Sequence, residues 1–187
     1  MIDRFGKRKK DILSKLDKSN KNSWDEKIKE LCDKINSLEN YYTTSSCSGR
    51  AILMIEQDKK DKGLFLSVYH DKISFEKLKE DLNSALKVGK NIKFKLEPCI
   101  LHVSCKTLED AEKIYEKAKL AGWNKSGIIG TKYGFNVELN GTDRLEFPTI
   151  QEGKVLVDDE FLKIVVDESN KKLEKSWMKI KKLEKLL

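Results

Sequence analysis

The segment YYTTSSCSGR, residues 41–50, lies between a helical pattern and the apolar run AILMI at 51–55. The apolar run predicts a buried strand, so we expect the preceding segment to be a short, ordered polar loop rather than a linker. Its hydroxyl groups can donate and accept, Gly49 lets backbone amides approach an anion, and Arg50 offers a planar fork to a carboxylate or phosphate. Considered alone, the segment is better explained as a turn between strands with a surface arginine.

A strand-strand-helix block follows this segment. Residues 51–55 and 64–70 predict two antiparallel strands joined by a charged turn at 58–63. Ser74 is a candidate N-cap for the helix that comes next, and Gly89 is expected to end that helix.

A second block repeats the pattern. Residues 93–97 and 99–105 alternate as strands do, with Pro98 breaking the run between them. Thr107 is expected to cap the next helix, and Gly122 to close it.

A Ser-Gly dipeptide precedes the first block, and another follows the second block. Ser126 and Gly127 precede an apolar strand, as Ser48 and Gly49 do. Two strand-strand-helix blocks with two Ser-Gly loops suggest an internal duplication.

The late part of the chain predicts further short strands. Residues 127–132 and 133–139 are expected to pair through a turn near 132–134, and residues 145–148 form a short edge strand that Pro148 stops. A third short run occupies residues 155–157.

Helices are predicted at both ends. Residues 1–20 form a basic amphipathic pattern, a second helix with Ser23 as its candidate N-cap runs to about Leu38, and a long basic helix covers 159–187. The sequence therefore predicts an α+β fold with mixed or antiparallel sheets and flanking helices. We expect one domain, 1–187, with amino-terminal helices at 1–40, an α+β core at 41–158 and the carboxy-terminal helix.

The charge balance favours a polyanionic partner. The 187 residues include 38 Lys and Arg against 31 Asp and Glu, which leaves a net charge of +7. A lysine- and glutamate-rich surface of the thermophilic kind explains this composition nearly as well. No apolar run approaches about 20 residues and no signal sequence is present, so we expect a cytoplasmic protein without a membrane partner.

The four cysteines do not predict a metal site. Their spacing lacks a CxxC pair, and a reducing compartment disfavours disulfides, so most are expected in the core. A zinc site built from Cys47, Cys105, His70 and His102 has suitable ligand types, but it lacks the paired spacing of structural zinc sites. We expect no metal.

Only two histidines are available for acid-base chemistry. His70 is the better candidate for proton transfer, because a strand end exposes it and the neighbouring Asp71 can hold its tautomer. His102 lies within an apolar alternating strand and is more typical of a packed core histidine. A nucleophile at Cys47 would need a histidine beside it in space, and neither a GxGxxG fingerprint nor a P-loop is present.

Motifs along nearly the whole chain resemble one family. Residues 42–50 are similar to the signature of the tRNA wybutosine-synthesizing protein 3 family, the wyosine-base methyltransferases of archaea and eukaryotes, here of the archaeal type. Further matching segments occur in the family's order: DKS at 17–19, SWDE at 23–26, the strand ending in His70, KFKLEP at 93–98, ILHVSC at 100–105, DA at 110–111, AGWNKSGI at 121–128 and LEFP at 145–148. The chain departs at 139–142, where LNGT replaces the Arg-Ser-Thr of many relatives, so a role of that arginine is not carried over.

The resemblance implies a function and a fold. The function is methyl transfer from S-adenosylmethionine to nitrogen 4 of a demethylwyosine-type tricyclic base, beside the anticodon of phenylalanine tRNA. The fold implied is not the Rossmann-like methyltransferase, in agreement with the missing glycine fingerprint. The alternative is a non-catalytic tRNA-binding or assembly protein of the same pathway. The partner expected is tRNA rather than DNA, and the oligomeric state stays open.

The resemblance also implies roles for individual residues. His70 or His102 is the candidate base. The candidate cofactor-binding residues are Ser45, Ser46, Ser48, Gly49, Arg50, Ser126 and Gly127. The candidate substrate-binding residues are Glu97, Trp123 and Tyr133.

Overall fold

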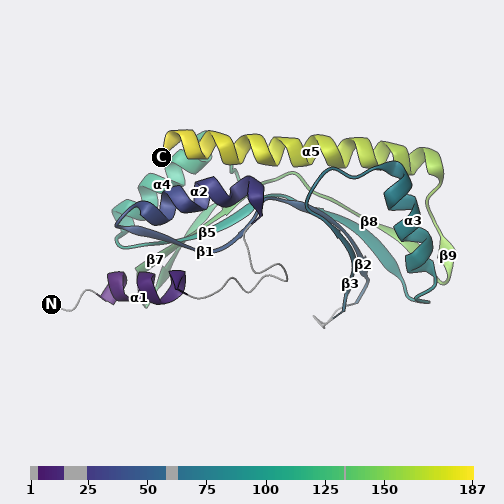
Figure 1. The fold of residues 1–187 in the computed structure, drawn as a ribbon, viewed down its shortest axis with the longest axis horizontal. Coiled ribbons are helices and arrows are strands. Elements are labelled where there is room, and N and C mark those ends of the chain that lie inside the picture. The colour runs from purple at the N-terminus through teal and green to yellow at the C-terminus, as the bar shows by residue number, and fades with distance from the viewer. Residues whose placement is uncertain (1–3, 15–24, 58–62, 133) are drawn as a thin grey trace. The chain divides into compact units, whose positions relative to one another are not determined.

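The computed structural model describes residues 4–14, 25–57, 63–132 and 134–187 (Figure 1). These residues form five helices and nine strands, which confirms the predicted α+β class. They group into two compact units, the first made of Met1–Ser48, Cys99–Thr142 and Ser176–Leu187, and the second of Gly49–Pro98 and Asp143–Lys175. The expected divisions after residues 40 and 158 do not mark these units, because each sheet takes strands from distant parts of the chain. That 1–187 is a single domain stays a prediction.

The first unit is built on a four-stranded antiparallel sheet. Its strand order is β1-β5-β7-β6. The strands are β1 (Tyr41–Cys47), β5 (Ile100–Cys105), β7 (Gly134–Asn140) and β6 (Gly127–Thr131).

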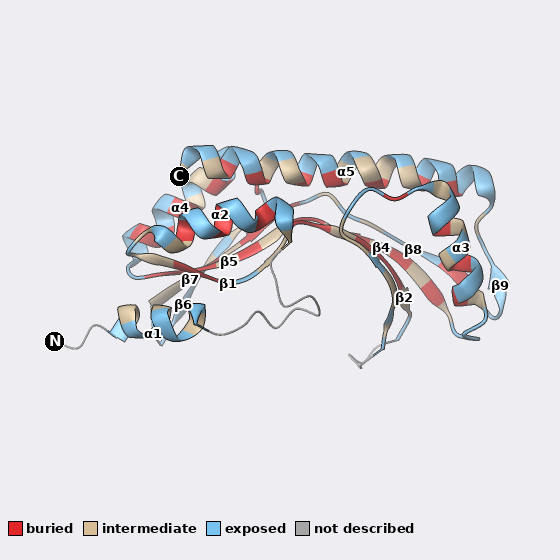
Figure 2. Cartoon of the chain, viewed as in Figure 1, coloured by how far each residue is buried: buried red, intermediate tan, exposed pale blue. Residues whose placement is uncertain are grey.

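One face of this sheet is apolar. Side chains alternate along a strand, so Leu101 and Val103 point to the face opposite His102 and Ser104. Both apolar residues are fully buried in a core that also takes side chains from α2 (Glu26–Ser37), α4 (Leu108–Leu120) and the end of α5 (Asp159–Leu186). In Figure 2, buried residues (red) alternate with intermediate and exposed ones along these helices, so each helix buries one side only.

The other face of the sheet is polar and carries α1 (Arg4–Leu13), on the side away from α2 (Figure 1). The ring of Phe5 in α1 lies 5.2 Å from the ring of Tyr42 in β1. By contrast, α2 contacts the next residue of β1, where Asn36 accepts from the Thr43 amide at 2.8 Å. The two helices therefore cover opposite faces of the same strand.

Three of the predicted helix ends are confirmed. Thr107 accepts from the Asp110 amide at the start of α4, and Ser74 accepts from Lys77 at the start of α3 (Phe75–Leu86). Gly122 follows α4 with φ 93°, the left-handed conformation expected at C′. Asp25 occupies the N-cap position of α2. The predicted cap Ser23 lies outside the described residues.

The second unit contains a five-stranded antiparallel sheet of order β3-β2-β4-β8-β9. The strands are β2 (Arg50–Ile55), β3 (Phe65–Tyr69), β4 (Ile92–Glu97), β8 (Leu145–Gln151) and β9 (Lys154–Val155). Phe147 of β8 lies 5.3 Å from Phe94 and 5.3 Å from Phe161 of α5, so aromatic packing links that helix to the sheet.

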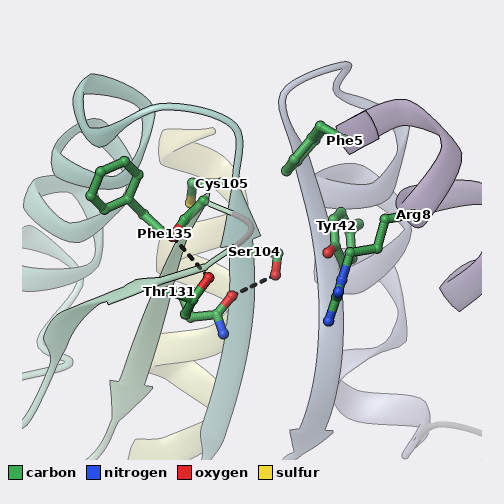
Figure 3. A pocket seen from close by; sticks show the side chains of 9 residues that line it. Phe5, Arg8, Tyr42, Ser104, Cys105, Thr131 and Phe135 are labelled. Carbon is green, nitrogen blue, oxygen red and sulfur yellow. Dashed lines mark hydrogen bonds between the residues drawn. The ribbon is translucent and has the colours of Figure 1, made fainter. Parts of the chain in front are cut away.

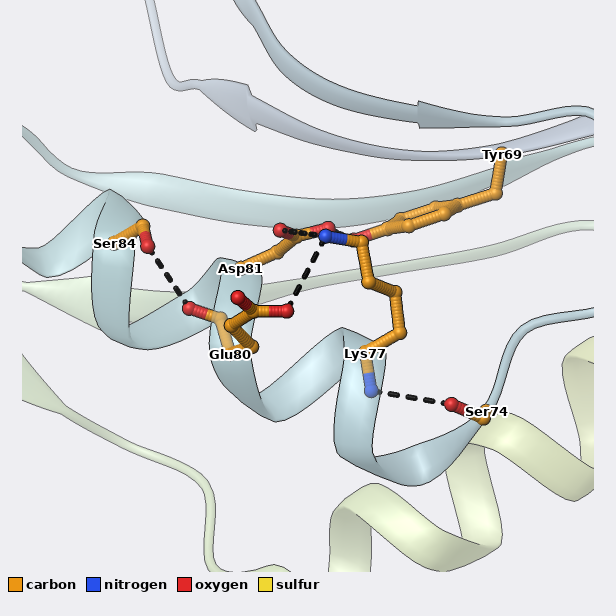
Figure 4. Close-up of polar contacts among 6 residues, drawn as sticks. All are labelled: Tyr69, Ser74, Lys77, Glu80, Asp81 and Ser84. Carbon is orange, nitrogen blue, oxygen red and sulfur yellow. Dashed lines mark hydrogen bonds and ion pairs between the residues drawn. The ribbon is translucent and has the colours of Figure 1, made fainter.

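Helix α3 is linked to β3 by Tyr69, a half-buried residue (Figure 4). The Tyr69 hydroxyl donates to Asp81 at 2.5 Å, and Lys77 approaches the same carboxylate at 2.9 Å. Burial first, and then the bond to Asp81, raise the pKa of Tyr69. The hydroxyl therefore stays protonated and available as a donor at neutral pH.

Three features differ from the prediction. Residues 41–47 form a strand, not a loop, because all of them except Thr44 pair with β5. Strand β8 continues past Pro148 to Gln151, since that proline faces Lys93 at a register shift, where a missing N–H disturbs the ladder little. The short strand predicted at residues 155–157 is limited to Lys154–Val155 in the structure.

The predicted duplication is also wrong. Strands β2 and β3 pair with each other, but β4 belongs to the sheet of the second unit and β5 to that of the first. Pro98 separates these two strands and cannot donate to a ladder, so the chain leaves one sheet before it enters the next. The turn predicted at 58–63 lies mostly outside the described residues. None of the described helices has both the length and the apolar character needed to cross a bilayer.

Candidate functional site

Three polar side chains form a row across the polar face of the first unit's sheet. Ser45 of β1 is paired with His102 of β5, which is paired with Glu138 of β7. Directly paired residues share a face. The Ser45 Oγ lies 2.5 Å from the His102 Nδ1, and the His102 Nε2 lies 3.0 Å from the Glu138 Oε2. We call these three residues the His102 row.

The hydrogen bonds assign a role to each ring nitrogen. An ionised carboxylate only accepts, so the Nε2–H of His102 donates to Glu138. In a neutral imidazole the Nδ1 is then an acceptor, and the Ser45 hydroxyl donates to it. The side chains of His102 and Glu138 are 32% and 40% exposed, so a substrate can reach the row from solvent. This arrangement suits a general base that acts through a serine hydroxyl.

A β-bulge places Ser45 in the row. The pairing of β1 with β5 shifts between Thr43 and Ser45, which leaves Thr44 as the extra residue. Without the shift, Thr44 would face His102 and Ser45 would point to the apolar side. Bulges commonly redirect a side chain in this way beside functional sites.

A small pocket lies beside the row (Figure 3). Two residues along β5 and β7, the Ser104 hydroxyl donates to the Asn136 Oδ1 at 2.5 Å. This pair helps line a pocket of about 120 Å³. The other lining residues are Phe5, Arg8, Tyr42, Cys105, Thr131, Gly134 and Phe135.

Gly127 borders the row on its far side. It is paired with Glu138 across β6 and β7 and therefore shares the face of His102. A Cβ at this position would meet no protein atom within 4 Å. Packing therefore does not require a glycine here, and the space beside Glu138 is open.

Ser48 serves the architecture of the first unit. It is 1% exposed, and both its amide and its hydroxyl donate to the Asp25 Oδ2, at 3.0 and 3.1 Å. Gly49 follows with φ 101°, a conformation that favours glycine. This segment ties the end of β1 to the start of α2, which does not fit the predicted role of Ser48 in cofactor binding.

The remaining hydroxyl candidates in the first unit do not lie together. Ser46 is paired with Leu101 and points to the face opposite His102. Ser126 donates to the Trp123 carbonyl at 2.7 Å and so closes the turn after α4. Of the predicted hydroxyl residues, Ser45 is hydrogen-bonded to a histidine, His102.

Arg50 and Glu97 form a pair in the second unit. They are directly opposite on β2 and β4, and the Arg50 Nε lies 2.9 Å from the Glu97 Oε2. Lys95 approaches the other oxygen at 2.9 Å, and Arg50 also stands over the ring of Phe65 at 5.2 Å. The guanidinium predicted to bind a ligand carboxylate already holds one.

The charges around Glu97 shift its titration. Burial opposes its charged form, but the hydrogen bond from Lys95 and the charge of Arg50 outweigh burial and hold the pKa of Glu97 below its ordinary value of 4.5. A lowered pKa stabilises the folded state above the unfolded value, and this stability is lost as the pH falls through the folded value.

We therefore expect Glu97→Gln to lower the free energy of unfolding by about 1 kcal/mol at neutral pH. The difference from wild type should shrink as the pH falls below 4.5, because the wild-type carboxylate then becomes protonated. Urea titrations across this range measure both effects. The exposed Glu116→Gln is the control, and a difference that stays constant with pH would contradict the pairing.

The other predicted residues are placed as follows. Trp123 is fully buried, and its Nε1 donates to the Lys179 carbonyl at 3.2 Å, so its predicted role in substrate binding does not fit. Tyr133 lies outside the described residues. His70 follows β3 in the second unit, half-buried beside the exposed Asp71. Burial raises the pKa of the Cys105 thiol to about 12, so this thiol is not a nucleophile at neutral pH.

Sequence reasoning missed Glu138, Ser104 and Asn136. All three are polar positions in strands with an apolar alternation, which is the signal that was available. The sequence does not show the register of β5 against β7, which brings these residues together.

Known proteins resemble the chain over nearly its full length. The family model described as Methyltransferase TYW3 matches residues 7–187. The tRNA(Phe) 7-((3-amino-3-carboxypropyl)-4-demethylwyosine(37)-N(4))-methyltransferase of Thermococcus sibiricus is 35% identical over 184 residues, or 96% of this chain and 92% of that protein. The tRNA wybutosine-synthesizing protein 3 homolog of Mus musculus is 35% identical over 184 residues, 94% and 70% of the two chains.

A solved structure agrees with these matches. The PH1069 protein from Pyrococcus horikoshii superposes with a TM-score of 0.88 at 34% sequence identity, covering 97% of this chain and 92% of that one. Fold, length and sequence point to the same group of proteins. The chain belongs to the Methyltransferase TYW3 family.

Proposed function

We propose that this protein transfers a methyl group from S-adenosylmethionine to nitrogen 4 of a demethylwyosine-type tricyclic base in tRNA(Phe). The observation that carries the proposal is the His102 row on an open polar face, in a chain whose full-length relatives include an enzyme named for this reaction. The positive net charge of +7 suits a tRNA substrate, and the location proposed with it is the cytoplasm.

The reaction requires the protein to position the acceptor nitrogen and to remove its proton. S-adenosylmethionine, when bound, supplies a methyl group already activated on a sulfonium, so no covalent intermediate with the protein is needed. The chain's own residues must hold the acceptor nitrogen in line and remove its proton.

The His102 row performs the proton transfer. As the bond between nitrogen 4 and the methyl carbon forms and the carbon–sulfur bond breaks, the Ser45 oxygen accepts the proton of nitrogen 4. The Ser45 hydroxyl proton moves to the His102 Nδ1 at the same time, over the 2.5 Å hydrogen bond. Glu138 stabilises the resulting imidazolium through its bond to Nε2.

Some of the predicted cofactor-binding residues fit a methyl donor, and others do not. Ser45 and Gly127 fit, because Ser45 is exposed, Gly127 borders open space, and both share the face of the His102 row. Ser48 and Arg50 do not fit, because each already holds a carboxylate of the chain. The pocket of about 120 Å³ is too small for a whole cofactor, since ligand pockets measure about 300–1,000 Å³.

Gly127→Val tests the open space beside Glu138. We expect methyl transfer to fall at least about tenfold, because the branched side chain fills the surface that a ligand approaches. Stability should stay the same or rise, since valine is favoured in strands and a Cβ at this position has open space around it. Steady-state kinetics and thermal unfolding measure the two effects, with Gly130→Val, also open on β6, as the matched control. Equal activity losses at both glycines would argue against a ligand at Gly127.

Cofactor uptake separates the enzyme from a non-catalytic tRNA-binding protein. We expect isothermal titration calorimetry to show saturable binding of S-adenosylmethionine to the wild-type protein. A protein that binds tRNA with a steep salt dependence but never takes up the cofactor would instead support the assembly role.

A further inference from the structure

We propose that the pocket between α1 and the polar face binds the single-stranded tRNA nucleobase that neighbours the methylated one. The proposal rests on the proposed function and assigns a second subsite to it. The pocket's lining joins one side of β1 and α1 to the ends of β6 and β7 (Figure 3).

The size of the pocket fits one aromatic ring. A cavity of about 150 Å³ is known to take a benzene molecule. The pocket here measures about 120 Å³. Its volume is therefore of the order that takes part of one aromatic base, and is too small for a whole nucleotide or the tricyclic base with its side chain.

The chemistry of the lining fits a nucleobase. Phe5 and Tyr42 supply aromatic surface on one side, with their rings 5.2 Å apart. The Asn136 amide lies on another side with its oxygen held by Ser104, so its NH₂ group is the donor it can offer to a ring carbonyl. Aromatic stacking combined with amide hydrogen bonds is the usual way that proteins hold an unstacked RNA base.

The position of the pocket fits the neighbouring nucleotide. Ser104 and Asn136 are each two residues from the His102 row along their strands, a distance of about 7 Å. Adjacent nucleotides of an extended single strand span a separation of this order. A strand whose tricyclic base lies at His102 therefore brings the next base to the pocket.

The charge of α1 favours RNA over the cofactor as the source of the ring. The helix sequence RFGKRKKDIL carries five cations and one acid, and Arg8 itself lines the pocket. This surface attracts phosphates. S-adenosylmethionine also contains a purine ring, but it carries a net positive charge that this helix repels.

A double-mutant cycle tests the assignment. The probes are anticodon stem-loops of tRNA(Phe), either intact or with one abasic nucleotide on either side of the methylated position, and the readout is fluorescence anisotropy at fixed salt. We expect Phe5→Ala to weaken binding of the intact RNA about tenfold. Wild type should bind one of the two abasic RNAs about tenfold more weakly than the intact RNA. The Phe5→Ala variant should bind that abasic RNA and the intact RNA with the same affinity.

Matched variants control for charge and folding. No residue of α1 is buried, so Phe5→Ala should leave the fold intact. Arg8→Gln and Lys10→Gln each remove one positive charge, but only Arg8 lines the pocket, so its substitution should cost more. The proposal would be overturned if Phe5→Ala bound the RNA as tightly as wild type does. It would also be overturned if Phe5→Ala weakened the binding of the abasic RNAs as much as that of the intact RNA.

The remaining outcomes separate the two proposals. If Phe5→Ala weakened S-adenosylmethionine binding by calorimetry and left RNA binding unchanged, the ring would be that of the cofactor and the RNA subsite would be wrong. If the cycle gave the expected coupling but the wild-type protein transferred no methyl group, the subsite would stand and the proposed function would fail.

Discussion

His102→Gln is expected to lower the single-turnover rate of methyl transfer by a factor of about 10²–10⁴, the usual contribution of a general base. The glutamine keeps a polar side chain between Ser45 and Glu138 but cannot take up a proton. Binding of tRNA should change little, because His102 is a single partly exposed side chain and glutamine retains its polarity. Rapid-quench measurements with saturating tRNA give the rate, and anisotropy gives the affinity.

The other members of the His102 row should act as a unit with the histidine. Ser45→Ala breaks the relay, and Glu138→Gln removes the charge that stabilises the imidazolium. Because these groups share one step, we expect each double variant with His102→Gln to be no slower than His102→Gln alone. Losses that multiplied would mean that the residues contribute independently. A full rate in His102→Gln together with no activity in His70→Ala would move the base to His70.

Trp123→Ala is expected to cause the largest loss of stability, about 3–5 kcal/mol in the free energy of unfolding. The side chain is fully buried in the core of the first unit and donates to the Lys179 carbonyl, so truncation leaves both a cavity and an unsatisfied acceptor. Urea denaturation followed by circular dichroism measures the loss.

Two comparisons support the interpretation of the Trp123 result. Trp123→Phe retains most of the ring and should cost distinctly less than the alanine variant. Leu120→Ala, at a 67% exposed position of α4, is the control for a surface change. A loss below about 1 kcal/mol for Trp123→Ala would mean that the indole is not a core side chain and would restore Trp123 as a candidate substrate-binding residue.

The helices were predictable because their ends carry local signals. Ser74, Thr107 and Gly122 each act where the sequence places them, as caps and as a left-handed C′ residue. These signals depend on neighbours a few residues away, so the sequence contains them. The polar segment at 41–47 was mistaken for a loop because its partner strand, β5, is nearly sixty residues away in the chain.

The site was predictable in its residue types but not in its arrangement. Ser45 and His102 were both candidates, yet their contact depends on the bulge at Thr44, which no spacing in the sequence indicates. Glu138 was missed for the same reason, since only the pairing of β5 with β7 brings it to the imidazole. Arg50 was expected to bind a ligand, because the sequence does not show that Glu97 faces it across the sheet.

The central claim is tested most directly by following the methyl group itself. The substrates are tRNA(Phe) carrying the tricyclic base without its nitrogen 4 methyl group, and S-adenosylmethionine labelled in the methyl group. Nucleosides are analysed by mass spectrometry after wild type and His102→Gln have each reacted for the time that wild type needs for one turnover. We predict label at nitrogen 4 of the tricycle with wild type, and little or none with the variant despite its retained tRNA binding. Equal labelling by the two proteins would contradict the assignment of the His102 row as the site of methyl transfer.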